Sequence, residues 1–192
     1  MSFASIAMRN ILCALALFFS YEVEASMRTY GDYLEDLGQR ESGGDYSIAN
    51  SFGYLGKYQF GEAALRNCRL YNDDLTKKND WIGTWSAEAN SHGVASKEAF
   101  LRTPNFQEFS IRRYNTLNWS EIVRLGLTQY IGQTIGGLQI TPSSLLGGAH
   151  LMGPGNVRKF LESAGGIDPA DGYGTRLSEY LAKFADYELP FK

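Results

Sequence analysis

The spacing of apolar residues predicts a helix that ends in a glutamate. Positions i, i+4, i+7 and i+11 are occupied by Tyr30, Leu34, Leu37 and Glu41. These residues share one face of a helix, and the two glycines after Ser42 end it. Because Glu41 continues the apolar face, its carboxyl group is predicted to face the protein interior or a cleft. Such surroundings disfavour the charged form of a carboxyl group, which suits a general acid working near neutral pH.

Further helices are predicted along the rest of the chain. They cover residues 61–67 and 96–101, a segment from Pro104, residues 142–152, a segment from Val157, and residues 176–187. Thr103 and Thr141 each stand before a proline, as a capping residue before the first helical position, and Thr175 is expected to cap the last helix. Residues 46–59, rich in Gly, Ser and Asn, are expected to form an extended loop or a short hairpin. The predicted fold class is mostly α, with this small β or loop excursion after the first helix.

The first residues of the chain form a segment of their own. Arg9 precedes an apolar run over residues 11–19, and Val23-Glu24-Ala25 is a small-residue pattern suited to cleavage before Ser26. The run is too short for a stable membrane anchor. We therefore predict a signal peptide over residues 1–25, with Met8 as the expected start of translation. Residues 26–192 would then form one periplasmic or secreted domain without a membrane span.

Composition and charge limit the classes of partner and cofactor that are expected. The chain has 192 residues, 44% of them hydrophobic, which is typical of one globular domain. A formal net charge of −3 provides no broad basic face, so nucleic acid is not expected as a partner. Two distant histidines and Cys68, the one cysteine outside the signal segment, indicate no zinc site, and no metal or cofactor is expected. The acidic residues 168–172 lack the spacing of a calcium-binding EF-hand loop and are interpreted as a solvated turn.

Glu41 also begins a pattern of specific spacing. Its members are Glu41-Ser42, the polar Asp45 at +4, Gly53 at +12, Gly56 at +15 and Gln59 at +18. The pattern resembles that of the soluble-type lytic transglycosylases, which have Glu-Ser, a polar residue, two glycines and a glutamine at the same offsets. A Glu-Ser pair alone would be a weak signal, whereas the full set of spacings is fairly specific.

A second element of the same family is partly present near residue 150. Its pattern, Ala-Tyr-Asn-x-Gly followed by Pro-Gly and an apolar residue, is similar to residues 149–157. The alanine, the glycines and the proline agree, but His150 replaces the tyrosine and Leu151 replaces the asparagine. A histidine can still donate a hydrogen bond to the catalytic carboxyl group or to a sugar, whereas leucine cannot. The alternative role for His150 is that of an ordinary core histidine.

The resemblance implies both a fold and a reaction. The fold would be lysozyme-like, with a groove for a glycan strand and a single catalytic glutamate, Glu41. The substrate would be peptidoglycan, cleaved between N-acetylmuramic acid and N-acetylglucosamine by Glu41 acting as an acid and then as a base, which leaves 1,6-anhydro ends. Glycan strands would be the main partner, with a secretion or envelope apparatus as a further one.

The substrate-binding candidates are polar or aromatic residues near the two motifs. They are Ser42, Tyr46, Tyr58, Gln59 and His150. Hydroxyl and amide groups suit the hydrogen bonds that sugars offer, and tyrosine rings stack on sugar faces. Capping and loop bracing remain the alternatives for Ser42 and Gln59, as core packing does for the tyrosines.

Two other functions stay open at this point. Hydrolysis of the same bond by a muramidase needs a second carboxylate, for which Asp45, Glu62, Glu88 and Glu108 are candidates. A noncatalytic glycan-binding envelope protein is conceivable because the second element is altered. The retention of Glu41 within its full motif favours an enzyme.

Overall fold

The computed structural model describes residues 27–72, 76 and 78–191. The predicted signal peptide, residues 1–25, lies outside these described residues. The helices are α1 (Tyr30–Ser42), α2 (Glu62–Asn67), α3 (Ala87–Ser91), α4 (Lys97–Leu101), α5 (Pro104–Arg124), α6 (Pro142–Met152), α7 (Pro154–Glu162) and α8 (Leu177–Lys183), with the short 3-10 helix η1 (Leu127–Tyr130). Antiparallel pairs are formed by β1 (Tyr71–Asn72) with β2 (Thr84–Trp85) and by β3 (Thr134–Ile135) with β4 (Leu138–Gln139). The mostly α class is confirmed.

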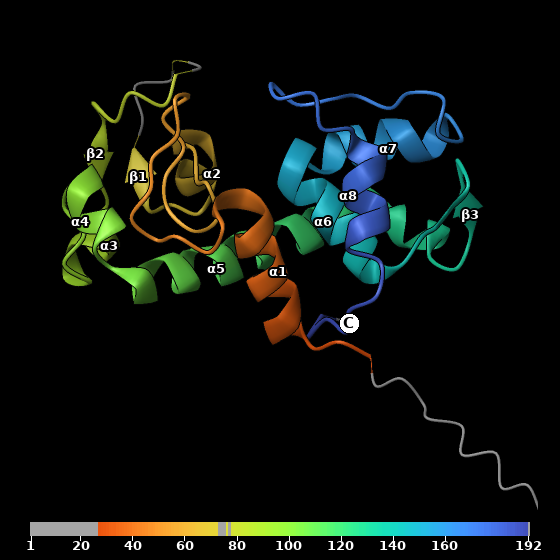
Figure 1. Cartoon of the computed structure of the whole chain (residues 1–192), viewed down its shortest axis with the longest axis horizontal. Helices are drawn as coiled ribbons and strands as arrows, with labels where there is room; N and C mark the ends of the chain where they lie inside the picture. The colour runs from red at the N-terminus through yellow and green to blue at the C-terminus, as the bar shows by residue number, and fades with distance from the viewer. Residues whose placement is uncertain (1–26, 73–75, 77, 192) are drawn as a thin grey trace, which may run out of the picture.

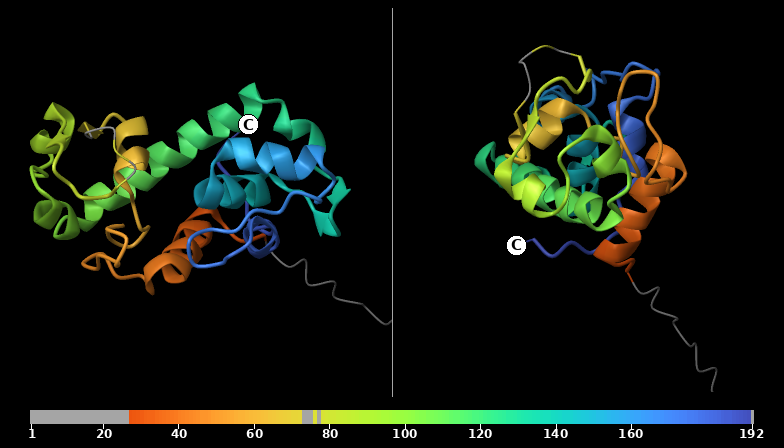
Figure 2. Two further views of the ribbon diagram at one scale, coloured as in Figure 1. Left: turned by 90° about the horizontal axis from the view of Figure 1, so that it is seen from above. Right: turned by 90° about the vertical axis from the view of Figure 1, so that its left-hand side faces the viewer.

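Helix α5 connects two groups of elements. It runs along the base of the molecule, with α2, α3, α4, β1 and β2 at one end and α6, α7, α8 and β3 at the other (Figure 1). At 21 residues it is about 30 Å long. Helix α1 lies between the two groups in Figure 1, and the view from above shows α5 running from one group to the other (Figure 2).

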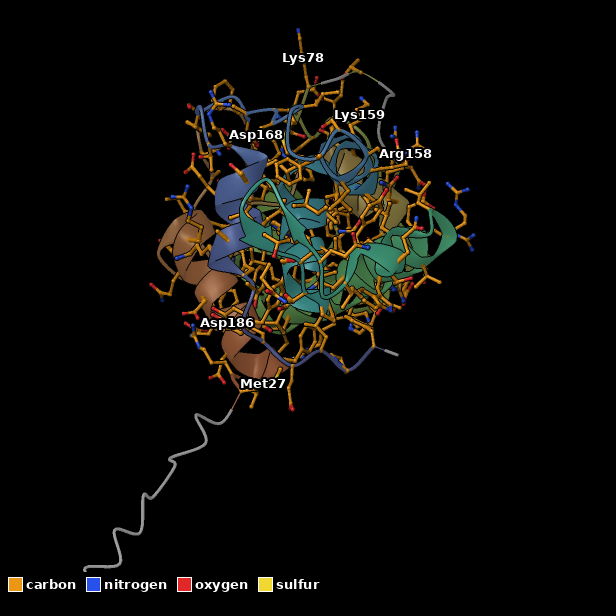
Figure 3. All side chains as sticks on the ribbon, turned by 90° about the vertical axis from the view of Figure 1, so that its right-hand side faces the viewer. Met27, Lys78, Arg158, Lys159, Asp168 and Asp186 are labelled. Carbon is orange, nitrogen blue, oxygen red and sulfur yellow. The ribbon has the colours of Figure 1, made fainter. Side chains whose placement is uncertain are left out.

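The apolar core consists of two clusters, and the first of them also takes in Tyr180 and Phe184 of α8. One cluster, which includes Leu37, Tyr58 and Phe100, joins α1, the loop after it and the first half of α5. The other, which includes Ile122 and Leu145, joins the second half of α5 with α6, α7 and α8. Charged side chains such as Arg158, Lys159 and Asp186 lie at the edge of the molecule, and Lys78 projects from its top (Figure 3). No helix within the described residues has both the length and the apolar character needed to cross a membrane.

Helix α1 starts and stops at local signals. Thr29 and Asp32 form a capping box, in which each side chain bonds the backbone N–H of the other. Gly43 takes a left-handed φ of 68° and donates its N–H to the carbonyl oxygen of Gln39. Glycine adopts this conformation without steric cost, so the helix ends where the sequence predicts and Glu41 stands in its last turn.

Loop 46–59 is fixed to α5 by one buried amide. Gln107 accepts the N–H of Lys57 at 2.9 Å and donates to the carbonyl oxygens of Tyr46 at 2.9 Å and Phe100 at 3.0 Å. Gly56, with a φ of +71°, lies so close that a Cβ there would stand 2.0 Å from Gln107 Oε1. Single antiparallel bridges, Ala49 to Leu55 and Leu55 to Phe60, give the loop its hairpin-like course. The loop is therefore held in place beside α1.

Several predicted boundaries differ from the observed ones. The last helix ends at Lys183 and not near residue 187, because the following chain pairs with the N-terminal segment and Glu188 donates its N–H to the carbonyl oxygen of Arg28 at 2.7 Å. Thr175 does not cap this helix, since Arg176 occupies the N-cap position. Thr103 forms no side-chain cap either, and its hydroxyl donates to the carbonyl oxygen of Ala99. Helix α7 begins at Pro154, before the predicted start at Val157.

Candidate functional site

A groove of about 870 Å³ lies between the two groups of elements. One wall comes from loop 46–59 and residues 78–80, and the other from α6, residues 171–175 and α8. The end of α1 contributes Arg40 and Glu41. The groove therefore brings together residues as far apart in the sequence as Arg40 and Tyr180.

The carboxyl group of Glu41 is mostly buried but reaches the groove. Its side chain is 16% exposed. Its Oε1 atom accepts a short hydrogen bond from the hydroxyl of Tyr180 on α8, and His150 Nε2 on α6 lies 3.7 Å from the same oxygen. No described residue hydrogen-bonds the other oxygen, Oε2. Glu41 thus has one oxygen held by the protein and one left for a ligand.

Tyr180 is a functional candidate that the sequence did not reveal. Burial raises the pKa of its phenol, and the neighbouring Glu41 carboxylate raises it further. The hydroxyl group therefore stays protonated and remains a donor to Glu41. The helical period predicts Tyr180 on the apolar face of the last helix, but periodicity reports where the ring lies and not what its hydroxyl group reaches, 139 residues away in the chain.

His150 stands beside Glu41 as a neutral imidazole. Its side chain is only 9% exposed, and burial lowers its pKa more than the Glu41 carboxylate raises it. Its Nδ1 atom is buried without a hydrogen-bond partner among the described residues. The ring meets that of Tyr114 edge-on, with centroids 5.9 Å apart. His150 is thus held by packing and keeps hydrogen-bonding capacity near the catalytic candidate.

Gln59 reaches the groove from the end of loop 46–59. Its Nε2 atom donates to the carbonyl oxygen of Gly56 at 2.9 Å, so part of its amide braces the loop. Its backbone has a φ of 47°, a left-handed value that is uncommon for residues other than glycine. Strain of this kind persists only where surrounding contacts hold it. Gln59 therefore combines the bracing and groove-lining roles, with its side-chain oxygen as the remaining acceptor.

Three of the predicted binding residues lie outside the groove lining. Tyr58 is fully buried, and its hydroxyl donates to Glu108 at 2.5 Å. Tyr46 donates to the same carboxylate at 2.8 Å. Ser42 donates to the carbonyl oxygen of Lys57 at 2.9 Å. A fully buried ring cannot stack on a sugar, so the interpretation of Tyr58 as a groove contact is corrected: with Tyr46 and Ser42 it fastens loop 46–59 to α5 and α1.

A buried lysine strengthens the same fastening. Lys57 is 5% exposed, and its Nζ atom lies 2.7 Å from Glu35 Oε2 and 3.4 Å from Glu108 Oε1. A buried charge is costly unless it is paired, and here both carboxylates supply that pairing. The cluster links α1, the loop and α5.

The carboxylates proposed as partners of Glu41 have other contacts. Asp45 accepts from Ser47, Glu62 from the N–H of Trp81, Glu88 from Arg113, and Glu108 from Tyr46 and Tyr58. None of the four lines the groove. The lining instead includes Asp80 and Asp171. Asp171 Oδ1 accepts the N–H groups of Tyr173 at 2.9 Å and Thr175 at 2.8 Å, so the segment interpreted as a solvated turn forms part of the groove wall.

The described residues do not form a metal site. Among them, no group of three or more His, Cys, Asp or Glu side chains is placed to hold a metal ion. Cys68 is buried, and burial raises the pKa of its thiol to about 12. Since the thiolate is the reactive form of cysteine, Cys68 is inert near neutral pH.

Comparisons with known proteins give no relative for the site. The chain matches no family model, no curated protein and no solved structure. A function is therefore inferred from the residues and the geometry of the groove.

Proposed function

We propose that the protein is an exported peptidoglycan lytic transglycosylase with a lysozyme-like fold. The observation that carries the proposal is the meeting of Glu41, Gln59 and His150 in one groove. These residues come from the two separate sequence elements that resemble the family. Spacing along the chain does not by itself bring them together, so their convergence is independent support for the resemblance.

The groove suits a sugar polymer. Its volume of about 870 Å³ lies within the usual range of ligand pockets, and its lining mixes amide, carboxylate and aromatic groups. Phe52, Tyr54 and Tyr173 offer rings that are 39% to 62% exposed. Rings of this kind can stack on sugar faces, while polar groups bind hydroxyl and N-acetyl groups.

Glu41 acts first as a general acid. In the protonated state it donates its proton to the glycosidic oxygen, and the bond from that oxygen to C1 of N-acetylmuramic acid breaks. Tyr180 holds Oε1, which directs Oε2 towards the bond being cleaved. The leaving N-acetylglucosamine thereby receives the proton as a hydroxyl group.

Glu41 then acts as a base. Its carboxylate accepts the proton of the C6 hydroxyl of N-acetylmuramic acid as the C6 oxygen attacks C1. The new C1–O6 bond closes a 1,6-anhydro ring, so the substrate supplies its own nucleophile and no water is consumed. The groove has to position that hydroxyl, which replaces the second carboxylate of a hydrolase.

Hydrolysis is the alternative function, because a second carboxylate lies in the groove. Asp171 lines the same groove and lies close enough to Tyr180 to influence its pKa. Its Oδ1 atom is occupied by two backbone N–H groups, which suits a role in holding the turn better than one in activating water. Products with reducing ends would nevertheless identify a muramidase.

Digestion of purified sacculi tests the proposal. The domain of residues 26–192 should release soluble muropeptides, and Glu41→Gln should reduce release at least about 100-fold, because a general acid–base group contributes that much or more. Glu121→Gln is the matched control, since Glu121 pairs with Arg124 on the surface of α5 outside the groove. Wild-type release of muropeptides by Glu41→Gln would contradict the mechanism. Binding of sacculi by the wild type without any release would indicate a glycan-binding protein.

A further inference from the structure

Two exposed aromatic rings meet across the groove. Phe52 and Tyr173 are 54% and 62% exposed, and both line the groove. Their ring centroids are 5.0 Å apart, with an angle of 77° between the ring planes. This is an edge-to-face contact, the arrangement that aromatic pairs favour. Neither ring belongs to either apolar core cluster of the described residues, so core packing does not account for the pair.

The rings come from opposite walls. Phe52 stands at the tip of loop 46–59, and Tyr173 stands in the connection between α7 and α8. These two segments approach each other at the top of the molecule in Figure 1 and lie close together in both views of Figure 2. Glu41 lies at the end of α1, which is farther down in Figure 1. The ring contact therefore joins the two walls of the groove.

The loop that carries Phe52 is rigidly held. Asn50 Oδ1 accepts the N–H groups of Phe52 at 2.9 Å and Tyr54 at 3.0 Å. Trp81 Nε1 donates to the carbonyl oxygen of Gly53 at 2.7 Å. Gly53 has a φ of +79°, and a Cβ there would stand 2.2 Å from the carbonyl oxygen of Asn79. The tip is therefore fixed both internally and against the neighbouring segment.

The segment that carries Tyr173 is held as well. Asp171 accepts the N–H groups of Tyr173 and Thr175. Arg40, next to Glu41 on α1, donates to the hydroxyl of Thr175 at 3.2 Å. The position of Tyr173 is thus tied to the helix that ends in the catalytic candidate.

We propose that Phe52 and Tyr173 form an aromatic strap that covers the groove, so that a glycan strand enters by its end and is cleaved from that end. The inference rests on the proposed function. A strand lying in an open groove can be loaded at any internal bond. A strand beneath a strap must be threaded, unless the ring contact first opens. The two rings would also stack on the threaded sugars.

Uncross-linked glycan strands labelled at one end provide the test. Early in the reaction, the wild type should release mainly terminal disaccharide units, with few fragments of intermediate length. Phe52→Ala/Tyr173→Ala should raise the share of internal cuts about two- to tenfold, the change in open population expected when one aromatic contact is lost. Phe52→Tyr keeps both rings and should retain the wild-type products.

A control variant tests whether any substitution in the connection between α7 and α8 alters the products. Ile167→Ala truncates another exposed apolar side chain between α7 and α8 that does not line the groove, and it should behave as the wild type. An active wild type that yields fragments of all lengths from the start overturns the strap alone, as does a double variant with unchanged products. A wild type that cleaves no strand overturns the proposed function and the strap with it.

Discussion

At the scale of single residues, the contact between Tyr180 and Glu41 is the one that most directly supports the proposed reaction. The phenol is kept protonated by burial and by the carboxylate it faces, so it donates to Oε1 throughout the working pH range. Fixing one carboxylate oxygen sets the direction of the other. In this account Tyr180 is a positioning residue for Glu41.

Tyr180→Phe should separate positioning from folding. A hydrogen bond to a charged group contributes roughly 1.5–3 kcal/mol, so kcat on soluble glycan strands should fall about 10- to 100-fold with little change in KM. Tyr187→Phe is the matched control, because Tyr187 donates to Asp36 at 2.6 Å outside the groove lining. It should lose stability but keep kcat. Equal effects of the two variants on kcat would show that Tyr180 acts only through stability.

At the scale of elements, loop 46–59 decides where the groove wall stands. It is fastened to α5 by Gln107 and to α1 by Ser42. Gly56 is placed so tightly that any side chain there meets Gln107. Glycine at this position of the motif is therefore explained by close approach of the loop to α5.

Gly56→Ala should destabilise the fold by about 2 kcal/mol or more, because it combines a left-handed backbone conformation with a clash. Gly93→Ala is the comparison: its φ is +78°, but nothing lies within 4 Å of the added Cβ. It should cost only the backbone strain, about 1 kcal/mol. Urea denaturation monitored by circular dichroism measures the free energy of unfolding of both variants. If Gly56→Ala lowers the free energy of unfolding no more than Gly93→Ala does, the predicted clash with Gln107 is wrong.

Elements set by local signals could be predicted from the sequence, and those set by distant contacts could not. The end of α1 follows from its glycines, and α6 follows from Thr141 and Pro142. The last helix stops early because the chain after Lys183 pairs with the segment around Arg28, far away in the sequence. The periodicity of apolar residues carries no information about a partner so distant in the sequence.

At the scale of the whole molecule, the groove results from the way α5 carries two groups of elements (Figure 1). The sequence motifs predicted Glu41, Gln59 and His150, all of which line the groove. They did not predict Tyr180 or Asp171, because their roles depend on how α8 and the segment before it return to α1. The net charge of −3 gives no general attraction to an acidic wall polymer, so the proposed function requires binding through local contacts in the groove.

The most direct test of the account is to find the source of the oxygen atom that becomes bonded to C1. Sacculi are digested with the domain of residues 26–192 in water enriched in heavy oxygen, and the released muropeptides are examined by mass spectrometry. The account predicts 1,6-anhydro ends, lighter than reducing ends by one water and free of heavy oxygen, because the C6 hydroxyl of the substrate attacks C1. Reducing ends that carry heavy oxygen at C1 would contradict it, since they would show that water is the nucleophile.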